Sequence, residues 1–288
     1  MVPVQVLSIQ SSVAYGHVGN SAAVFPLQRL GHEVWPVNTV HFSNHTGYGA
    51  WRGPLLDPAD VREVIAGIDD RGALAGVDAV LTGYQGDPAV GAVILEAVAR
   101  VKELNPDAIY CCDPVMGDVG RGMFVRPGIP EFMRDTVLPA ADILTPNHFE
   151  LDFLAGVTTR TMAEVLAAVD VVRARGPRNV LVTSVIVEDT APGSLDVVAV
   201  SDTKGAWAVT TPLLPITPNG CGDLTAALYL GHLLSWNWSV PTALERATSS
   251  VFAVLEATIA MGTREIQLVE AQEMIATPPS TFTARELR

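Results

Sequence analysis

Short apolar runs alternate with helical segments over almost the whole chain, and this alternation constrains the fold more than any other feature. Residues 4–9 form the first run, rich in β-branched side chains, and residues 21–30 follow as a helical segment that ends at Gly31. Strand, helix and strand in succession predict parallel strands, because the helix returns the chain to the same end of the sheet. The sequence therefore predicts an α/β fold with a mostly parallel central sheet and helices on both faces.

The same alternation continues to the end of the chain, and no repeat, low-complexity segment or linker interrupts it. Residues 1–288 are therefore expected to form one domain. Residues 41–57 break the pattern and are expected to form a loop or edge element over a pocket, and the tail 277–288 is expected to be held loosely. Further strands are expected at residues 33–38, 78–81, 108–112, 142–144, 179–182, 195–200 and 206–210, with the last two antiparallel and joined at 202–205. Further helices are expected at residues 58–74, 88–104, 130–137, 148–155, 162–175, 223–235, 241–261 and 269–276.

Composition excludes several classes of protein. With 49% hydrophobic residues and a net charge of −13, the chain is globular, and it has no run of Lys or Arg that would favour nucleic acid as a partner. No apolar run reaches membrane-spanning length, and the chain opens without the segments of a signal peptide, so no membrane association and a cytoplasmic location are expected. The three cysteines are expected to be buried thiols, because their number is odd and two are adjacent.

Polar side chains stand at the ends of most predicted strands. Open parallel sheets bind ligands beyond the carboxyl ends of their strands, so these residues are candidates for one site. Helix capping is the alternative for Ser, Thr, Asn and Asp at such positions, but it does not explain Asp113, which precedes a proline and a loop, and it is not expected to explain Glu150. The candidates are Ser11, Tyr84, Asp113, Thr145, Asn147, Thr183, Ser184 and the segment 220–223.

The segment Gly220–Cys221–Gly222–Asp223 precedes an apolar helical stretch. Glycines let backbone N–H groups approach an anion closely, and a helix start adds the positive end of its dipole. A carboxylate there is well placed to take a proton from a hydroxyl that attacks phosphorus. The alternatives are that Asp223 only caps the helix and that Cys221 acts as a nucleophile; a space-filling role is favoured for Cys221.

Carboxylates in the strand-end set are candidates for a metal site. Asp113, Asp118 and Glu150 are oxygen ligands of the kind that Mg²⁺ uses together with nucleotide phosphates. A metal would also offset the acidic charge of the chain during phosphoryl transfer. No P-loop and no Gly-x-Gly-x-x-Gly after the first strand occur, which disfavours P-loop and dinucleotide-binding folds.

Six stretches of the chain resemble the pyridoxal kinases of the ribokinase-like superfamily, in order and nearly from end to end. They are residues 9–20 (IQSSVAYGHVGN), 36–49 (PVNTVHFSNHTGYG), 82–84 (TGY), 112–118 (CDPVMGD), 145–150 (TPNHFE) and 220–223 (GCGD). The resemblance implies a single-domain, ribokinase-like three-layer sandwich. It also implies ATP-dependent phosphorylation of the 5′-hydroxyl of pyridoxal, with pyridoxine and pyridoxamine as further substrates, to give pyridoxal 5′-phosphate in vitamin B6 salvage.

Site residues follow from the resemblance position by position. Asp223 is implied as the catalytic base, with the amides of Gly220, Cys221 and Gly222 as the anion hole. The residues implied to bind substrate are Ser11, Val18, Phe42, Thr46, Gly47, Tyr84 and Asp223. Those implied on the ATP side are Asp113, Asn147, Glu150, Thr183 and Ser184. Metal-linked residues are Asp118 and Glu150 for Mg²⁺, and Asp113, Thr145 and Thr183 for a monovalent cation, K⁺ or Na⁺.

The resemblance further implies a homodimer and a loop, residues 116–126, that closes over ATP. Two departures from the family stand out. Cys221 takes the place of Thr or Val, a change that a backbone role tolerates, and Thr183 takes the place of a lysine that some bacterial relatives carry. No role is assigned to Asn219.

Two other functions remain open on the sequence. One is a superfamily kinase that acts on a pyrimidine or a sugar hydroxyl. The other is a binding protein that stores pyridoxal phosphate, held if needed as a Schiff base on one of the two lysines, Lys102 or Lys204.

Overall fold

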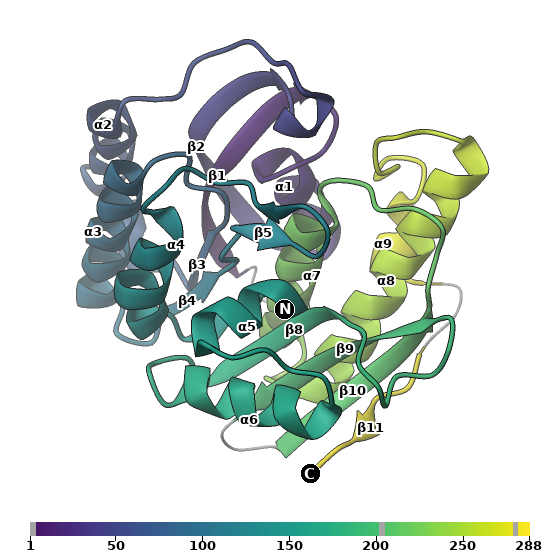
Figure 1. Cartoon of the computed structure of the whole chain (residues 1–288). Coiled ribbons are helices and arrows are strands. Elements are labelled where there is room, and N and C mark those ends of the chain that lie inside the picture. Colours follow the sequence, from purple (N-terminus) through teal and green to yellow (C-terminus); the bar gives the residue numbers. More distant parts are fainter. Residues whose placement is uncertain (1–3, 202–204, 279–281) are drawn as a thin grey trace.

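A nine-stranded sheet runs through the middle of the molecule (Figure 1). The computed structural model describes residues 4–201, 205–278 and 282–288. The strands lie in the order β11-β10-β9-β8-β7-β4-β3-β1-β2, and those from β8 to β2 are parallel. Their bounds are β1 Gln5–Tyr15, β2 Glu33–Asn44, β3 Ala79–Thr82, β4 Ile109–Cys112, β7 Ile143–Leu144, β8 Asn179–Val185, β9 Ser194–Ser201, β10 Gly205–Pro212 and β11 Arg285–Glu286.

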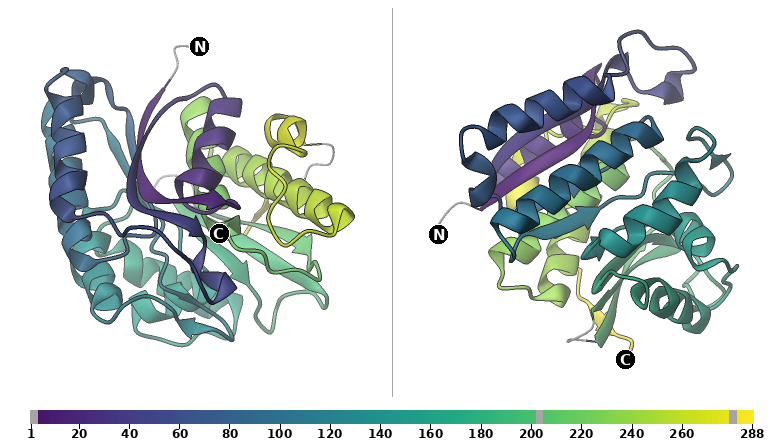
Figure 2. Two further views of the ribbon diagram at one scale, coloured as in Figure 1. Left: turned by 90° about the horizontal axis from the view of Figure 1, so that it is seen from above. Right: turned by 90° about the vertical axis from the view of Figure 1, so that its left-hand side faces the viewer.

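Helices cover both faces of the sheet, which gives three layers (Figure 2). One face packs against α1 (Asn20–Arg29), α7 (Cys221–Ser235), α8 (Val240–Met261) and α9 (Gln272–Ala276). The other packs against α2 (Pro58–Asp69), α3 (Pro88–Leu104), α4 (Ile129–Phe132), α5 (His148–Ala155) and α6 (Met162–Arg173). Strands buried on both sides contribute neighbouring residues to opposite cores, as Val6 and Leu7 do. The predicted α/β fold in a single domain is confirmed.

Local sequence explains where two of these helices begin. Asp57 and Asp87 stand directly before Pro58 and Pro88, and each carboxylate accepts a hydrogen bond from the N–H two residues on, at 2.8 and 2.9 Å. Proline suits the first helical turn because the N–H that it lacks has no partner there.

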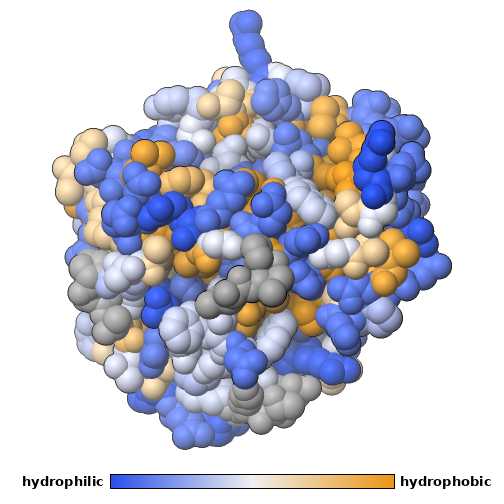
Figure 3. All heavy atoms as spheres, turned by 180° about the vertical axis from the view of Figure 1, so that it is seen from behind, coloured by the Kyte–Doolittle hydropathy of each residue, from blue (hydrophilic) through white to orange (hydrophobic). Residues whose placement is uncertain are grey.

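Hydrophilic residues cover most of the face opposite to Figure 1, with apolar groups between them (Figure 3).

Several boundaries differ from the sequence prediction. β1 continues beyond residue 9 to Tyr15, and β2 continues beyond residue 38 to Asn44, because the two strands keep pairing past an irregularity between Gln10 and Ser12. Ser11 therefore lies within a strand. β8 likewise continues to Val185. The first part of the predicted edge element, residues 41–44, belongs to β2, an edge strand of the sheet.

Two helical predictions also change. α2 ends at Asp69 and the chain turns at Gly72, whose φ of 68° is left-handed, before a short 3₁₀ turn at Ala73–Gly76. The predicted helix 130–137 is α4 followed by a π-helical turn, Met133–Val137.

Part of the tail that was expected to be held loosely pairs with the sheet, whereas residues 279–281 of that tail lie outside the described residues. Arg285–Glu286 forms β11 and pairs antiparallel with β10, and the N–H of Leu287 donates to the carbonyl of Ala206 at 2.8 Å. The antiparallel pair β9–β10 is as predicted, whereas residues 202–204 of its joining turn lie outside the described residues. No helix in the described part of the chain is long and apolar enough to cross a membrane.

Candidate active site

A cavity of about 1020 Å³ opens at the carboxyl ends of the parallel strands. It receives side chains from β1, β2, β8, the loop after β4 and the N-terminus of α7. All of the predicted site residues line it except Gly47, which lies behind Thr46 against the side chain of Asn219. The topology thus brings together residues separated by more than two hundred positions in sequence.

The N-terminus of α7 forms one wall of the cavity. Gly220 is the residue before the helix, with φ +91° and ψ −9°, and Asp223 lies in the first turn. The N-cap position therefore belongs to Gly220, so Asp223 is not the N-cap residue that the capping alternative required. The first N–H groups of a helix lack partners within it, so this end of the cavity suits an anion.

Carboxylates lie close together below this helix start. A Cβ built on Gly222 would be 3.7 Å from Asp113 Oδ2, and one on Gly83 would be 3.4 Å from Asp223 Oδ1. Burial raises the pKa of Asp223 to about 6. Burial, followed by the charges of Glu150 and Asp223, raises the pKa of Asp113 well above its ordinary value.

Glu150 holds the adjacent loop in place. Its Oε1 accepts hydrogen bonds from the N–H groups of Met116 (2.7 Å) and Gly117 (3.3 Å), and its Oε2 accepts from the N–H of Asn147 (2.9 Å). Burial raises the pKa of Glu150 to about 7, although these backbone hydrogen bonds oppose the rise. Asn147 and Glu150 also form a capping box at the start of α5, which corrects the expectation that capping does not explain Glu150.

The loop held by Glu150 forms a small hairpin over the cavity. Its strands are β5 (Gly117–Asp118) and β6 (Gly122–Met123), and Asp118 lines the cavity. Asn147 Nδ2 donates to the carbonyl of Gly117 at 2.8 Å, and Arg121 Nη1 donates to Asn219 Oδ1 at 3.2 Å. The hairpin therefore connects α5 to the residue that precedes Gly220.

The two ends of the cavity differ in character. The apolar end, as we call it, is formed by Val13, Val18, Val40, Phe42, Leu55 and Tyr84. Ser11 of β1 and Thr46, in the short turn after β2, also line the cavity. The α8 end contains Thr183 and Ser184 together with apolar side chains that sequence reasoning did not single out. These are Leu195, Val197, Val251, Phe252 and Leu255.

Charges along the cavity are mostly negative. The lining residues include four with carboxyl groups, Asp113, Asp118, Glu150 and Asp223, and two arginines, Arg121 and Arg126. No group of three His, Cys, Asp or Glu side chains in the described residues lies close enough to hold a metal ion by itself. A metal would therefore need oxygen ligands from a bound phosphate or water. The buried hydroxyl of Thr145 lies near Asp113, and its interaction with that carboxyl partly opposes the rise in the Asp113 pKa.

The lysine postulated for a Schiff base does not reach the cavity. Lys102 Nζ lies 2.6 Å from Asp142 Oδ2, and Lys102 is not among the cavity residues. Lys204 lies outside the described residues.

Cys221 should react slowly with an alkylating reagent, although it lines the cavity. Burial, followed by the charge of Asp223, raises the pKa of Cys221 to about 12, and burial raises the pKa of Cys112 to about 12 as well. Since only the thiolate reacts, we expect alkylation of all three thiols by iodoacetamide at pH 8 to be more than about 100-fold slower than that of free cysteine. Mass spectrometry gives the rates, with complete labelling in guanidinium as the control. Rapid labelling of Cys221 in the native protein would contradict this expectation.

Known proteins resemble this chain over its full length. A family model described as phosphomethylpyrimidine kinase matches residues 58–269. Pyridoxal kinase PdxY of Rubrobacter xylanophilus is 60% identical over 283 residues, which cover 98% of this chain and 97% of the relative. The protein of the same name from Leifsonia xyli is 56% identical, with 96% and 98% covered. The solved structure of Leishmania donovani pyridoxal kinase in complex with ADP and pyridoxamine has a TM-score of 0.91 and 30% identity, with 99% of each chain covered.

The three-layer fold, the cavity at the strand ends and the similarity to a solved pyridoxal kinase structure define a small-molecule kinase of the ribokinase-like class. Two pyridoxal kinases are 60% and 56% identical to it over nearly its whole length. The chain belongs to the pyridoxal kinase family.

Proposed function

We propose that this protein transfers the γ-phosphoryl group of ATP to the 5′-hydroxyl of pyridoxal, and also of pyridoxine and pyridoxamine, to give the 5′-phosphates for vitamin B6 salvage. The observation that carries the proposal is the position of Asp223, which lies in the first turn of α7 and lines the same cavity as the residues of the apolar end. Relatives named pyridoxal kinase match almost the whole chain, and the Leishmania donovani structure is a complex with ADP and pyridoxamine.

In the proposed mechanism, Asp223 acts as the base. It accepts the proton of the 5′-hydroxyl while that oxygen forms a bond to the γ-phosphorus, and the bond from the γ-phosphorus to the oxygen of ADP breaks. The amides of residues 220–222 stabilise the negative charge of the transferring group. A pKa of about 6 leaves most Asp223 ionised at neutral pH and therefore able to accept the proton.

The substrate ring would occupy the apolar end of the cavity, between Val18, Phe42 and Tyr84. Ser11 and Thr46 would bind its polar substituents, and Gly47, which does not line the cavity, would act only through its neighbours. Asp113, Asn147, Glu150, Thr183 and Ser184 would lie beside ATP, with the adenine against the apolar side chains of the α8 end.

Mg²⁺ is the proposed divalent metal, since four carboxylates line a cavity that must also hold a triphosphate. Asp118 and Glu150 would bind it together with phosphate oxygens and water, and the ion would neutralise charge on the phosphates. Glu150 already accepts three backbone hydrogen bonds. Its carboxylate would therefore bind Mg²⁺ while keeping these hydrogen bonds, or would bind it through a water molecule. Asp113, Thr145 and Thr183 are proposed to bind K⁺ or Na⁺.

We further propose that the protein is a cytoplasmic homodimer. The buried free thiols Cys111 and Cys112 suit a reducing compartment.

A second candidate substrate is a hydroxymethylpyrimidine, because the matching family model carries a phosphomethylpyrimidine kinase description. Its hydroxymethyl group could meet the same base, and the apolar end could hold its six-membered ring in the same way. The two substrates compete for one pocket, so relative kcat/KM values separate them.

The test is ATP-dependent phosphorylation of the three B6 vitamers and a hydroxymethylpyrimidine, with and without K⁺. We expect one ADP per 5′-phosphate formed, the highest kcat/KM for a B6 vitamer, and loss of turnover when EDTA removes Mg²⁺. Preference for the pyrimidine by more than about tenfold would favour the second candidate. Tight pyridoxal phosphate binding without ATP turnover would instead indicate a binding protein.

A further inference from the structure

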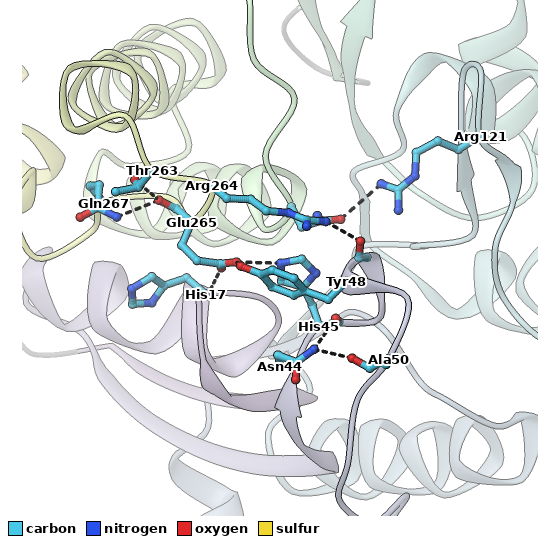
Figure 4. Close-up of polar contacts among 12 residues, drawn as sticks. His17, Asn44, His45, Tyr48, Ala50, Arg121, Thr263, Arg264, Glu265 and Gln267 are labelled. Atoms are coloured by element: carbon cyan, nitrogen blue, oxygen red, sulfur yellow. Dashed lines mark hydrogen bonds and ion pairs between the residues drawn. The ribbon is translucent and has the colours of Figure 1, made fainter.

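Glu265, in the loop after α8, connects segments that border the apolar end of the cavity (Figure 4). Its side chain is buried, and it is not among the residues that line the cavity. Oε1 accepts a hydrogen bond from the hydroxyl of Tyr48 at 2.6 Å and lies 2.9 Å from His45 Nε2. Oε2 accepts from the N–H of His17 at 3.2 Å. One carboxylate therefore joins the β1–α1 turn to the segment after β2.

The carboxylate has little freedom to move. A Cβ built on Gly16, where φ is +89°, would be 2.0 Å from Glu265 Oε2, so the carboxylate occupies the space that this glycine leaves open. The backbone is fixed as well, because Thr263 Oγ1 (3.0 Å) and Gln267 Nε2 (2.8 Å) both donate to the Glu265 carbonyl. The group is held in position before any substrate binds.

Glu265 determines the orientation of the His45 ring. A carboxylate only accepts hydrogen bonds, so Nε2 carries the proton that faces it, and in the neutral ring Nδ1 is an acceptor. His45 Nδ1 is buried and finds no partner among the described residues, although His45 lines the cavity. It lies 2.9 Å from the point where a Cβ on Gly47 would be, and Asn219 Nδ2 is also 2.9 Å from that point. Gly47 thus keeps a small space open between two polar groups.

Arg264 and ring stacking hold the other residues of the segment 45–48 in place. The rings of His45 and Tyr48 stack with centroids 4.7 Å apart. The Arg264 guanidinium lies 4.0 Å above the Tyr48 ring and also donates to the carbonyl of Gly47. Both neighbours of Thr46 are therefore fixed by consecutive residues, Arg264 and Glu265.

His17, which donates its backbone N–H to this carboxylate, also borders Gly220. The carbonyl of His17, whose N–H binds Glu265, would be 1.9 Å from a Cβ on Gly220, and Ile266 Cδ1 would be 3.2 Å from it. Burial alone would raise the pKa of Glu265, but hydrogen bonds from Tyr48 and His45 outweigh it and leave the pKa below its ordinary value. The hydrogen bond to Glu265 raises the pKa of Tyr48 to about 12. Glu265 is therefore charged, and Tyr48 remains a donor, at neutral pH.

We infer that Glu265 is a positioning residue for the hydroxyl substrate: through its contacts with His45 and Tyr48 it holds two cavity residues, His45 and Thr46, in the arrangement that receives the substrate ring. Glu265 itself does not touch the substrate. The inference rests on the proposed function, since it assigns the apolar end of the cavity to the hydroxyl substrate and not to ATP.

The experiment compares Glu265→Gln with Glu270→Gln. The first substitution removes the charge and turns one acceptor into a donor, whereas the second removes an exposed charge of the same sign five residues away. Hydrogen bonds to a charged group are the stronger ones, so we expect Glu265→Gln to raise KM for pyridoxal by about tenfold or more. KM for ATP should stay within about twofold of that of the unmodified protein, as should both KM values of Glu270→Gln.

Two further variants keep the inference open to refutation if Glu265→Gln does not fold. Tyr48→Phe removes one donor and keeps the ring, and should raise KM for pyridoxal by about threefold. Gly47→Ala places a methyl group between His45 and Asn219 and should also act on KM for pyridoxal alone.

The positioning role would be overturned if Tyr48→Phe and Gly47→Ala left KM for pyridoxal unchanged. It would also be overturned if folded Glu265→Gln changed KM for pyridoxal and KM for ATP by the same factor. If instead the unmodified protein phosphorylates no B6 vitamer, the proposed function fails, which is a different result from an active enzyme indifferent to Glu265.

Discussion

Asp223→Asn should lower kcat for pyridoxal phosphorylation by about 1000-fold while pyridoxal binding changes little. The amide keeps the shape of the side chain but cannot accept the hydroxyl proton, and general-base catalysis typically contributes about 10²–10⁴-fold. Stopped-flow or coupled ADP assays give kcat, and equilibrium titration with pyridoxal gives the affinity. The position of Asp223 in the first turn of α7, on the cavity wall, is the basis for this expectation.

A matched control separates chemistry from helix electrostatics. Asp60 lies in the first turn of α2 and is exposed, so Asp60→Asn loses the same favourable interaction with a helix dipole but lies away from the cavity. We expect its kcat to stay within about twofold of that of the unmodified protein. Near-normal turnover in Asp223→Asn would show that another group is the base.

The same assignment predicts the acid side of the pH profile. Burial raises the pKa of Asp223 to about 6, so the base becomes protonated as the pH falls through that value. The kcat/KM for pyridoxal should therefore decrease below about pH 6, and Asp223→Asn should lose this dependence.

Gly220→Ala should abolish detectable turnover and lower the free energy of unfolding by more than about 3 kcal/mol. A Cβ at this position would lie 1.9 Å from the carbonyl oxygen of His17, and the φ of +91° is itself unfavourable for alanine. The loop would have to move, and the amides of residues 220–222 would no longer face the transferring group. Urea unfolding and the kinase assay measure the two effects.

Gly31→Ala is the control for the backbone contribution. Gly31 has a φ of +89°, almost the value of Gly220, but a Cβ there would meet nothing within 4 Å. Its cost should be only about 1 kcal/mol, the strain of a left-handed alanine, with kcat unaffected. Equal losses of stability in the two variants would mean that the contact between Gly220 and His17 is unimportant.

Much of the site was accessible from sequence because each residue type follows a local rule. Asp113 and Thr145 stand directly after apolar strands, and Gly220 and Asp223 flank a helix start, so a parallel sheet brings them to one edge. Ser11 was predicted as a site residue because it was expected to follow the first strand, but it lies within β1. The capping box of Asn147 and Glu150 could also have been read from their spacing of three.

Other parts of the site carried no local signal. Val251, Phe252 and Leu255 of α8 have the pattern of ordinary core residues, and only the tertiary structure shows that they line the cavity. Arg121 and Asn219 are 98 positions apart and meet because the hairpin of β5 and β6 folds over the cavity.

The sequence by itself determined the parallel sheet with helices on both faces and the positions of Asp113 and Thr145 at strand ends, because hydrophobic periodicity and glycine placement act locally along the chain. The tertiary structure decided how far β1 and β2 extend, how the end of the chain pairs with β10, and how Glu265 holds His45 from 220 positions away. The physical reason is that strand pairing and a buried hydrogen bond depend on which groups the completed fold brings within about 3 Å of each other, and no local pattern in the chain encodes that distance.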